Sequence, residues 1–214
     1  MKFNLNNNKK QNTTSIQKSF FEKTFVNYFR PTFYIKSIED INLDSLKTQG
    51  INSVICDLDN TLVPHYLGTP NKRTINFIND VKRNNLDFYL VSNNSEKRVT
   101  KFVEKLQMKN IEIDNFYWSV KKPLTKNINK IIEDNQLDKS KIIMIGDQLE
   151  MDILAANILH IQSILVEPVF DSGYNFNFFT NIFEKYIYKK LARFNTLEKG
   201  HYDFFEISDD FKIL

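Results

Sequence analysis

A regular alternation of short apolar runs and helical segments is the feature that most constrains this chain. The apolar runs, which predict buried strands, are 51–56, 86–91, 113–119, 141–145 and 161–166. Between them, apolar residues recur at helical spacing in segments 74–84, 96–108, 124–135 and 151–159. Strands that alternate with helices build a parallel sheet with helices on both faces. The pattern therefore predicts an α/β fold with a parallel five-stranded sheet.

The segments that flank this core predict the organisation of the rest of the chain. Residues 1–15 are polar and Asn-rich, and helical spacing of apolar residues begins only after them. We expect four parts: a disordered tail (1–15), an N-terminal amphipathic helix with a linker (16–49), the core (50–169), and a C-terminal amphipathic helix with a tail (170–214).

Composition excludes several classes of protein. A net charge of +3, from 29 Lys and Arg against 26 Asp and Glu, is too small to favour a nucleic-acid partner. One Cys excludes a disulfide framework or a Cys-rich zinc site and is typical of a reducing compartment. The apolar runs are far shorter than the roughly 18 residues of a membrane-spanning helix. The N-terminus also lacks the apolar segment of a secretory signal. We therefore expect a cytoplasmic protein.

Polar side chains follow four of the predicted strands where each strand ends. Asp57 and Asp59 follow the first strand, 92–94 (Ser-Asn-Asn) the second, Lys122 the third and Asp147 the fourth. Because the carboxyl ends of parallel strands lie at one edge of a sheet, where ligands bind, we expect these residues to meet.

The chemistry of these residues suits a phosphoryl group. Two carboxylates as close as Asp57 and Asp59 suppress each other's ionisation, so that one can attack while the other holds a proton. Asp147 adds a third carboxylate, and such oxygen ligands suit Mg²⁺. Ser92 supplies a hydrogen-bond donor and Lys122 a positive charge for phosphoryl oxygens. The sequence lacks Gly-x-x-x-x-Gly-Lys, Gly-x-Gly-x-x-Gly and Gly-x-Ser-x-Gly, which excludes a P-loop, a dinucleotide fingerprint and a serine-hydrolase elbow.

The four clusters resemble, in order, the four motifs of the haloacid dehalogenase (HAD) phosphatase superfamily. Longer segments resemble the YqeG family of subclass III HAD phosphatases, relatives of the mitochondrial phosphatidylglycerophosphate phosphatase. These segments are DLDNTLV (57–63), VSNNSEKRV (91–99), KKPL (121–124), GDQLEMDIL (146–154) and ILVEPV (164–169).

This resemblance implies a HAD-like Rossmannoid fold without a cap domain and an aspartyl-phosphate mechanism that requires Mg²⁺. Asp57 would attack phosphorus, and Asp59 would act first as general acid and then as general base. The implied catalytic residues are Asp57, Asp59, Ser92 and Lys122, with Lys121 as the alternative lysine. Those implied to bind the phosphorylated substrate are Thr61, Ser92, Asn93 and Lys122. The implied metal ligands are Asp57, Asp59 through its backbone carbonyl, and Asp147. Asn94 and Asp152 would support the site, Asp152 by orienting Lys122 or by supporting the metal.

The lengths of the intervals between the motifs indicate which kind of substrate the site can accept. The intervals from Val63 to Ser92 and from Asn94 to Lys122 each hold one helix and one strand, which leaves no room for a cap domain. An uncapped site suits a phosphate on a large or surface-bound substrate. Together with the resemblance, this favours a lipid headgroup, with phosphatidylglycerophosphate converted to phosphatidylglycerol. The alternatives are a nucleotide or phosphoprotein phosphatase, and a non-catalytic interaction protein for ribosome or RNA assembly.

The two aromatic, basic helices have two interpretations. A stripe of Phe at helical spacing usually packs against the core. Phe with Lys or Arg nearby also suits an anionic membrane interface. We expect peripheral contact with the inner face of the membrane through 177–194, whose predicted apolar face comprises Phe179, Ile182, Phe183, Tyr186, Ile187 and Leu191.

Overall fold

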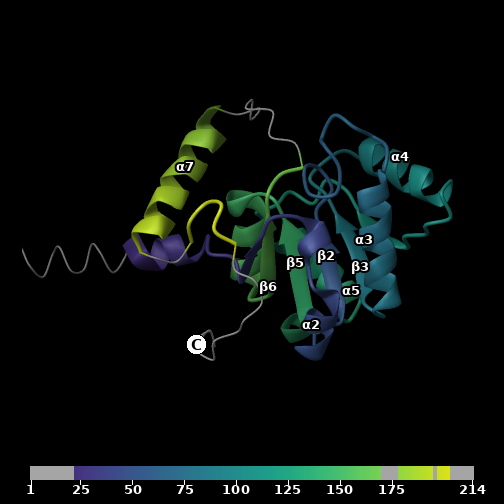
Figure 1. Cartoon of the computed structure of the whole chain (residues 1–214), viewed down its shortest axis with the longest axis horizontal. Helices are drawn as coiled ribbons and strands as arrows, with labels where there is room; N and C mark the ends of the chain where they lie inside the picture. Colours follow the sequence, from purple (N-terminus) through teal and green to yellow (C-terminus); the bar gives the residue numbers. More distant parts are fainter. Residues whose placement is uncertain (1–21, 170–177, 195–196, 203–214) are drawn as a thin grey trace, which may run out of the picture.

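A six-stranded parallel sheet forms the centre of the fold (Figure 1). The computed structural model describes residues 22–169, 178–194 and 197–202. The strands lie in the order β1-β6-β5-β2-β3-β4, and every pair is parallel. Their bounds are β1 (Phe33–Ile35), β2 (Ser53–Cys56), β3 (Asp87–Val91), β4 (Asn115–Tyr117), β5 (Ile142–Gly146) and β6 (Gln162–Val166). The predicted parallel α/β fold is confirmed.

The predicted number of strands is wrong by one. Phe33–Ile35, which the sequence places in a linker, forms β1 at the edge of the sheet beside β6. Phe33 lies opposite Ile164, and all three residues of β1 are buried. So short a run carries no detectable alternation, and its partner lies far away in the sequence, so that only tertiary pairing identifies it as a strand.

Helices cover both faces of the sheet (Figure 1). Because side chains alternate along a strand, Val54 and Cys56 of β2 pack with α2, α3 and α4, whereas Ile55 packs with α5 and α6. The helices are η1 (Ile38–Asp40), α2 (Leu43–Thr48), α3 (Lys72–Arg83), α4 (Glu96–Gln107), α5 (Lys126–Asp134), η2 (Lys139–Lys141), the π-helix η3 (Leu149–Ile153), α6 (Leu154–Leu159) and α7 (Phe178–Arg193).

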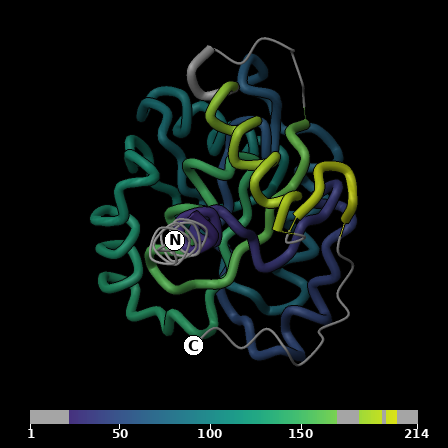
Figure 2. Tube along the Cα trace, turned by 90° about the vertical axis from the view of Figure 1, so that its left-hand side faces the viewer, coloured from purple at the N-terminus to yellow at the C-terminus, as the bar shows by residue number. Residues whose placement is uncertain are grey.

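A third cluster anchors the two ends of the described chain to the sheet. Val26 and Phe29 from the N-terminal segment, which is helical at 22–27, pack there with Ile187 and Leu191 of α7. The same cluster includes Tyr34 of β1. Figures 1 and 2 show α7 beside this N-terminal segment. A separate ion pair between Lys190 and Glu22 joins the two helices.

The predicted apolar face of the C-terminal helix is divided. Ile187 and Leu191 are fully buried, whereas Ile182, Phe183 and Tyr186 are 51%, 37% and 45% exposed. The side chain of Phe179 lies outside those that the structure describes, as does the predicted tail at 1–15. The helix therefore packs against the fold along one edge of its apolar face and presents the other edge to solvent.

No cap domain interrupts the core over the described residues 22–169. The described segment between β2 and β3 contains a loop and α3, and the segment between β3 and β4 contains α4. Within these two segments, no additional domain therefore lies over the carboxyl ends of the strands. Among the residues that the structure describes, no helix has the length and hydropathy required to cross a membrane.

Candidate active site

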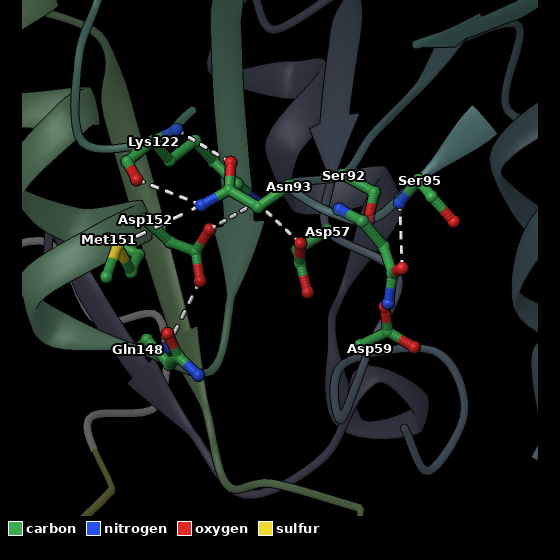
Figure 3. Close-up of a pocket in the computed structure, with 10 residues that line it drawn as sticks. Asp57, Asp59, Ser92, Asn93, Ser95, Lys122, Gln148, Met151 and Asp152 are labelled. Carbon is green, nitrogen blue, oxygen red and sulfur yellow. Dashed lines mark hydrogen bonds and ion pairs between the residues drawn. The ribbon is translucent and has the colours of Figure 1, made fainter. Parts of the chain in front are cut away.

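The carboxyl ends of β2, β3, β4 and β5, with the loops that follow them, line a cavity of about 590 Å³ (Figure 3). This position follows from the parallel topology, which brings every polar strand end to one edge. The lining residues are Asp57, Asp59, Ser92, Asn93, Asn94, Ser95, Lys122, Gln148, Met151 and Asp152. Most of the residues predicted for the site are therefore together in one cavity, and the other two, Thr61 and Asp147, lie next to it in contact with each other.

Lys122 lies buried at the centre of the polar network. Its ammonium Nζ donates to Asp57 Oδ1 at 2.5 Å, to Asp152 Oδ1 at 2.7 Å and to the backbone carbonyl of Val91 at 3.1 Å. Burial alone would lower the pKa of Lys122, but the carboxylates of Asp152 and Asp57 outweigh it and hold that pKa above its usual range. The lysine is a fixed cation. Lys121, the alternative lysine, is exposed and does not line the cavity.

Three buried carboxylates form a candidate metal site. Oxygens of Asp57, Asp147 and Asp152 lie within 4.8 Å of one another. Burial raises the pKa of Asp57 to about 7, although the Lys122 ammonium opposes it. Burial also raises the pKa of Asp147 well above its usual range, and the neighbouring Asp57 adds to that shift. Crowded carboxylates with hard oxygen donors gain from a divalent cation, so the donor set fits Mg²⁺.

The position of Asp152 depends on an unusual helix and on a glycine. The π-helix η3 follows β5, and such helices are frequent at functional sites. Within this turn the backbone N–H of Gln148 donates to Asp152 Oδ2 at 3.2 Å, which leaves Oδ1 for Lys122. A Cβ atom on Gly146 would lie 2.2 Å from Asp152 Cγ, so only glycine leaves room for this carboxylate. Asp152 thus forms an ion pair with Lys122 and also lies beside the other two carboxylates.

Asn93 fixes the backbone of Lys122. Its Nδ2 donates to the Lys122 carbonyl at 2.9 Å, and its Oδ1 accepts from the Lys122 N–H at 2.6 Å. The peptide bond from Lys122 to Pro123 is cis. The neighbouring Ser92 Oγ accepts from the backbone N–H of Asn94 at 3.1 Å, which leaves its hydroxyl hydrogen for another acceptor. The Asn93 side chain, predicted to bind substrate, is therefore engaged in holding the lysine in place.

Thr61, also predicted to bind substrate, contacts a carboxylate instead. The residue is fully buried, and its Oγ1 donates to Asp147 Oδ1 at 3.2 Å. Thr61 does not line the cavity, and Asp147 is the acceptor that its hydroxyl reaches in this structure. A threonine at that position identifies a hydrogen-bond donor, but the sequence does not reveal which acceptor it reaches.

The side chain of Asp59 has its own set of partners. Its Oδ1 accepts from Arg98 Nη2 at 2.7 Å and from Arg98 Nε at 3.2 Å, and its Oδ2 accepts from Asn94 Nδ2 at 3.0 Å. Asp59 lines the same cavity as Asp57 but is not a member of the cluster of three carboxylates. Figure 3 shows its side chain apart from those of Asp57 and Asp152. Its predicted contribution to the metal, a backbone carbonyl, remains a prediction.

Several residues at the site were missed by the sequence predictions. Ser95, Gln148 and Met151 line the cavity, and Arg98 contacts Asp59 from just outside it. A signal for Arg98 exists in the sequence, because it lies close after Asn94 in the segment VSNNSEKRV. Gln148 and Met151 carry the same kind of signal, because they lie beside Asp147 and Asp152 in the segment GDQLEMDIL.

Comparison with known proteins identifies the family. Residues 11–169 match the family described as Mitochondrial PGP phosphatase. The "Probable phosphatase YqeG" of Bacillus subtilis (strain 168) is 33% identical over 174 residues, which cover 81% of this chain and 95% of that protein.

The solved structures that match this chain do so at low identity. NagD from E. coli K-12 has a TM-score of 0.48 and 13% identity over 54% of this chain and 87% of that chain. A haloacid dehalogenase-like hydrolase from Streptococcus pneumoniae has a TM-score of 0.48 and 13% identity over 58% of this chain and 89% of that chain. The family match and the bacterial relative, both extending over most of the sequence, show that this chain is a HAD-like phosphatase and belongs to the mitochondrial PGP phosphatase family.

Proposed function

We propose that this phosphatase hydrolyses phosphatidylglycerophosphate to phosphatidylglycerol in a reaction that requires Mg²⁺ and forms an aspartyl-phosphate on Asp57. One observation carries the proposal. A buried ammonium, Lys122 Nζ, joins the nucleophile Asp57 to Asp152 in a cavity, and Asp147, next to that cavity, completes a cluster of three carboxylates. Such a fixed cation beside clustered carboxylates suits the transfer of a phosphoryl group, whose charge must be offset.

In the first step an oxygen of Asp57 attacks phosphorus, and the bond from phosphorus to the ester oxygen breaks. Asp59 gives its proton to that leaving oxygen, which departs as an alcohol. In the second step Asp59 takes a proton from water while the water oxygen attacks the phosphorus of the aspartyl-phosphate. Inorganic phosphate leaves, and the Asp57 carboxylate and the protonated Asp59 are restored.

The other residues stabilise charge during both steps. The hydroxyl of Ser92 donates to a phosphoryl oxygen, and Lys122 offsets negative charge on the nucleophile and the phosphoryl group. Asp57 and Asp147, with the backbone carbonyl of Asp59, would hold Mg²⁺. When bound, that ion supplies further positive charge to the phosphoryl oxygens.

Two observations support a lipid substrate. The family that matches this chain is named for the mitochondrial PGP phosphatase. The cavity also lies at the open edge of the sheet without a cap domain over the described core. A phosphorylated headgroup can therefore enter while the rest of the lipid remains in the membrane.

We also propose peripheral membrane contact through 177–194, at the inner face of the membrane. Ile182, Phe183 and Tyr186 are exposed on α7, and Lys185 and Lys189 are exposed nearby. Apolar side chains beside cations favour an anionic interface. In vesicle sedimentation, we expect the protein to bind vesicles that contain phosphatidylglycerol. A variant in which Ile182, Phe183 and Tyr186 are all replaced by serine should bind these vesicles several-fold less. The control is Met108→Ser, which removes an apolar side chain that is 82% exposed at the end of α4.

The function is tested by phosphate release from phosphatidylglycerophosphate in detergent, from a nucleotide, from a phosphopeptide and from p-nitrophenyl phosphate. Each substrate is assayed with Mg²⁺ and with EDTA, and Asp57→Asn serves as the inactive control. We expect turnover of the lipid that depends on both Mg²⁺ and Asp57. Faster turnover of the nucleotide or the phosphopeptide would retain the chemistry and overturn the lipid assignment. Turnover that survives in Asp57→Asn would overturn the proposed mechanism.

A further inference from the structure

The carboxylate of Asp59 is held by a network that the proposed mechanism does not yet use. Arg98 directs both Nε and Nη2 to Oδ1, at 3.2 and 2.7 Å, and Asn94 Nδ2 donates to Oδ2 at 3.0 Å. The side chains of Arg98 and Asp59 are only 16% and 18% exposed, so water weakens this pair less than it would at the open surface.

These bonds distinguish the two oxygens of Asp59. An ionised carboxylate offers about four lone-pair sites, two on each oxygen, and guanidinium and amide nitrogens can only donate. The two bonds from Arg98 occupy both sites of Oδ1, whereas the bond from Asn94 occupies one site of Oδ2. Of the bonds that the structure describes, none uses the second site on Oδ2. Oδ2 is therefore the atom on which a proton can reside while the network stays intact.

The position of Arg98 favours a role at the site over a role in the helix. Arg98 lies in the first turn of α4, where the helix dipole disfavours a positive charge. The buried face of α4, which includes Val99 and Phe102, fixes the helix against the sheet and so fixes the origin of the Arg98 side chain.

The loop after Asp59 also packs against this guanidinium. A Cβ atom on Gly68 would lie 3.3 Å from Arg98 Nη1, a distance tight enough to displace the arginine by a few tenths of an ångström. The glycine therefore leaves room for Arg98 in its present position. Arg98 contacts both the carboxylate and the loop that continues from it.

We propose that Arg98 is a positioning residue that makes Oδ2 of Asp59 the proton-carrying atom of the general acid and base. The inference rests on the proposed function, since it assumes that Asp59 donates a proton to the leaving group. With Oδ1 held by Arg98, the carboxyl group presents the same oxygen to the leaving alcohol in the first step and to water in the second. Without Arg98, the carboxyl group can rotate and the proton is divided between two oxygens.

The test is the dependence of kcat/KM on the leaving group, measured with a series of substituted phenyl phosphates. A good leaving group such as p-nitrophenolate needs no proton, whereas a poor one such as phenolate does. General acid catalysis is worth roughly 10²- to 10⁴-fold. We therefore expect Asp59→Asn to lose about 100-fold or more on phenyl phosphate and far less on p-nitrophenyl phosphate.

Arg98→Met should show the same dependence on the leaving group but a smaller effect, with kcat/KM about tenfold lower only for substrates with poor leaving groups. Arg98→Lys should recover part of the loss, because an ammonium keeps the charge but cannot direct two parallel N–H bonds at one oxygen. Arg83→Met, which removes an exposed arginine that is paired with Asp80, is the matched control and should leave the series unchanged. Thermal unfolding of every variant verifies that it is folded.

The outcomes separate this inference from the proposed function. A steeper dependence on the leaving group in Asp59→Asn but not in Arg98→Met would overturn the role of Arg98 and leave the mechanism intact. An equal loss on all esters in Arg98→Met, whether in kcat or in KM, would show a structural or anion-binding role and would also overturn it. If Asp59→Asn shows no dependence on the leaving group, the general acid of the proposed mechanism is wrong and the inference falls with it.

Discussion

Replacing Gly146 with alanine tests whether the site depends on the position of Asp152. Gly146 ends β5, and its backbone does not have the positive φ that disfavours alanine. The added methyl group would, however, lie 2.2 Å from Asp152 Cγ. The effect of the substitution is therefore a collision with one carboxylate in a buried ion pair.

The size of the effect follows from these distances. Non-bonded carbon atoms stay about 3.5 Å apart, so Asp152 must retreat by about 1.3 Å. Its Oδ1 is now 2.7 Å from Lys122 Nζ, and a retreat of that size along the bond would lengthen the contact to about 4 Å and break the hydrogen bond. Breaking a buried pair costs about 3–5 kcal/mol. Because Lys122 keeps Asp57 as a partner, we take about 3 kcal/mol, which lowers Tm by roughly 6–12 °C in a chain of this length.

Thermal unfolding and phosphatase activity with Mg²⁺ measure the result. We expect Gly146→Ala to show this fall in Tm and at least a tenfold lower kcat, since the misplaced Lys122 contacts the nucleophile. Gly50→Ala is the control. Gly50 has φ 88° and an empty space around its Cβ position, so alanine there costs only about 1–2 kcal/mol of backbone strain and should leave activity unchanged. If Gly146→Ala is as stable as Gly50→Ala and fully active, the reasoning about Asp152 is refuted.

Three further predictions concern the metal, its surroundings and α7. Burial raises the pKa of Asp57 from 3.8 to about 7. In the absence of metal, the contribution of Asp57 to the stability of the fold is therefore lost as pH rises through that range and the carboxyl group ionises. Because Mg²⁺ binds the ionised carboxylate, the increase in Tm caused by Mg²⁺ should be larger at pH 8 than at pH 5.5. An equal increase at both values would contradict this. Thr61→Val removes the hydrogen bond to Asp147 and should weaken Mg²⁺ binding about tenfold in a titration monitored by Tm. An unchanged affinity for Mg²⁺ would show that the Thr61 hydroxyl plays no part in metal binding. Leu191→Ala should lower the free energy of unfolding, measured in denaturant, by about 2–5 kcal/mol, whereas Ile182→Ala, at a half-exposed position, should change it little. Similar losses in the two variants would show that α7 is not anchored as described.

Much of the fold was predictable because its signals are local. Each of β2, β3, β5 and β6 is a short apolar run of its own, and the polar residues after three of these strands predicted the position of the cavity. β1 carries no comparable signal, since three residues, Phe33–Ile35, become a strand only by pairing with β6. The segment at 149–153 was predicted only in part, because the helical spacing over 151–159 does not distinguish a π-helical turn from an α-helix.

At the site, the sequence predicted residue types better than partners. Asn93 and Thr61 were expected to bind the substrate, but the acceptors that they reach are set by distances between loops from different strands. Arg98 was missed for the same reason, because an arginine in the first turn of a helix faces either solvent or the site according to the rotation of that helix. Only the three-dimensional arrangement distinguishes a residue that contacts substrate from one that holds its neighbour.

Every N–H group of the Lys122 ammonium already has an acceptor, and this determines whether the lysine stabilises the bound substrate or the transition state. An ammonium has three N–H groups, and Asp57, Asp152 and the Val91 carbonyl already accept all three. A phosphate that enters the site can therefore accept a hydrogen bond from Lys122 only if one of these three bonds is broken. The lysine consequently stabilises the bound substrate very little. In the proposed mechanism, the negative charge of Asp57 passes toward the phosphoryl oxygens as Asp57 forms its bond to phosphorus, and the N–H of Lys122 that Asp57 accepted can then donate to a phosphoryl oxygen. The lysine then interacts more strongly with the transition state than with the substrate, which is the condition for accelerating the chemical step.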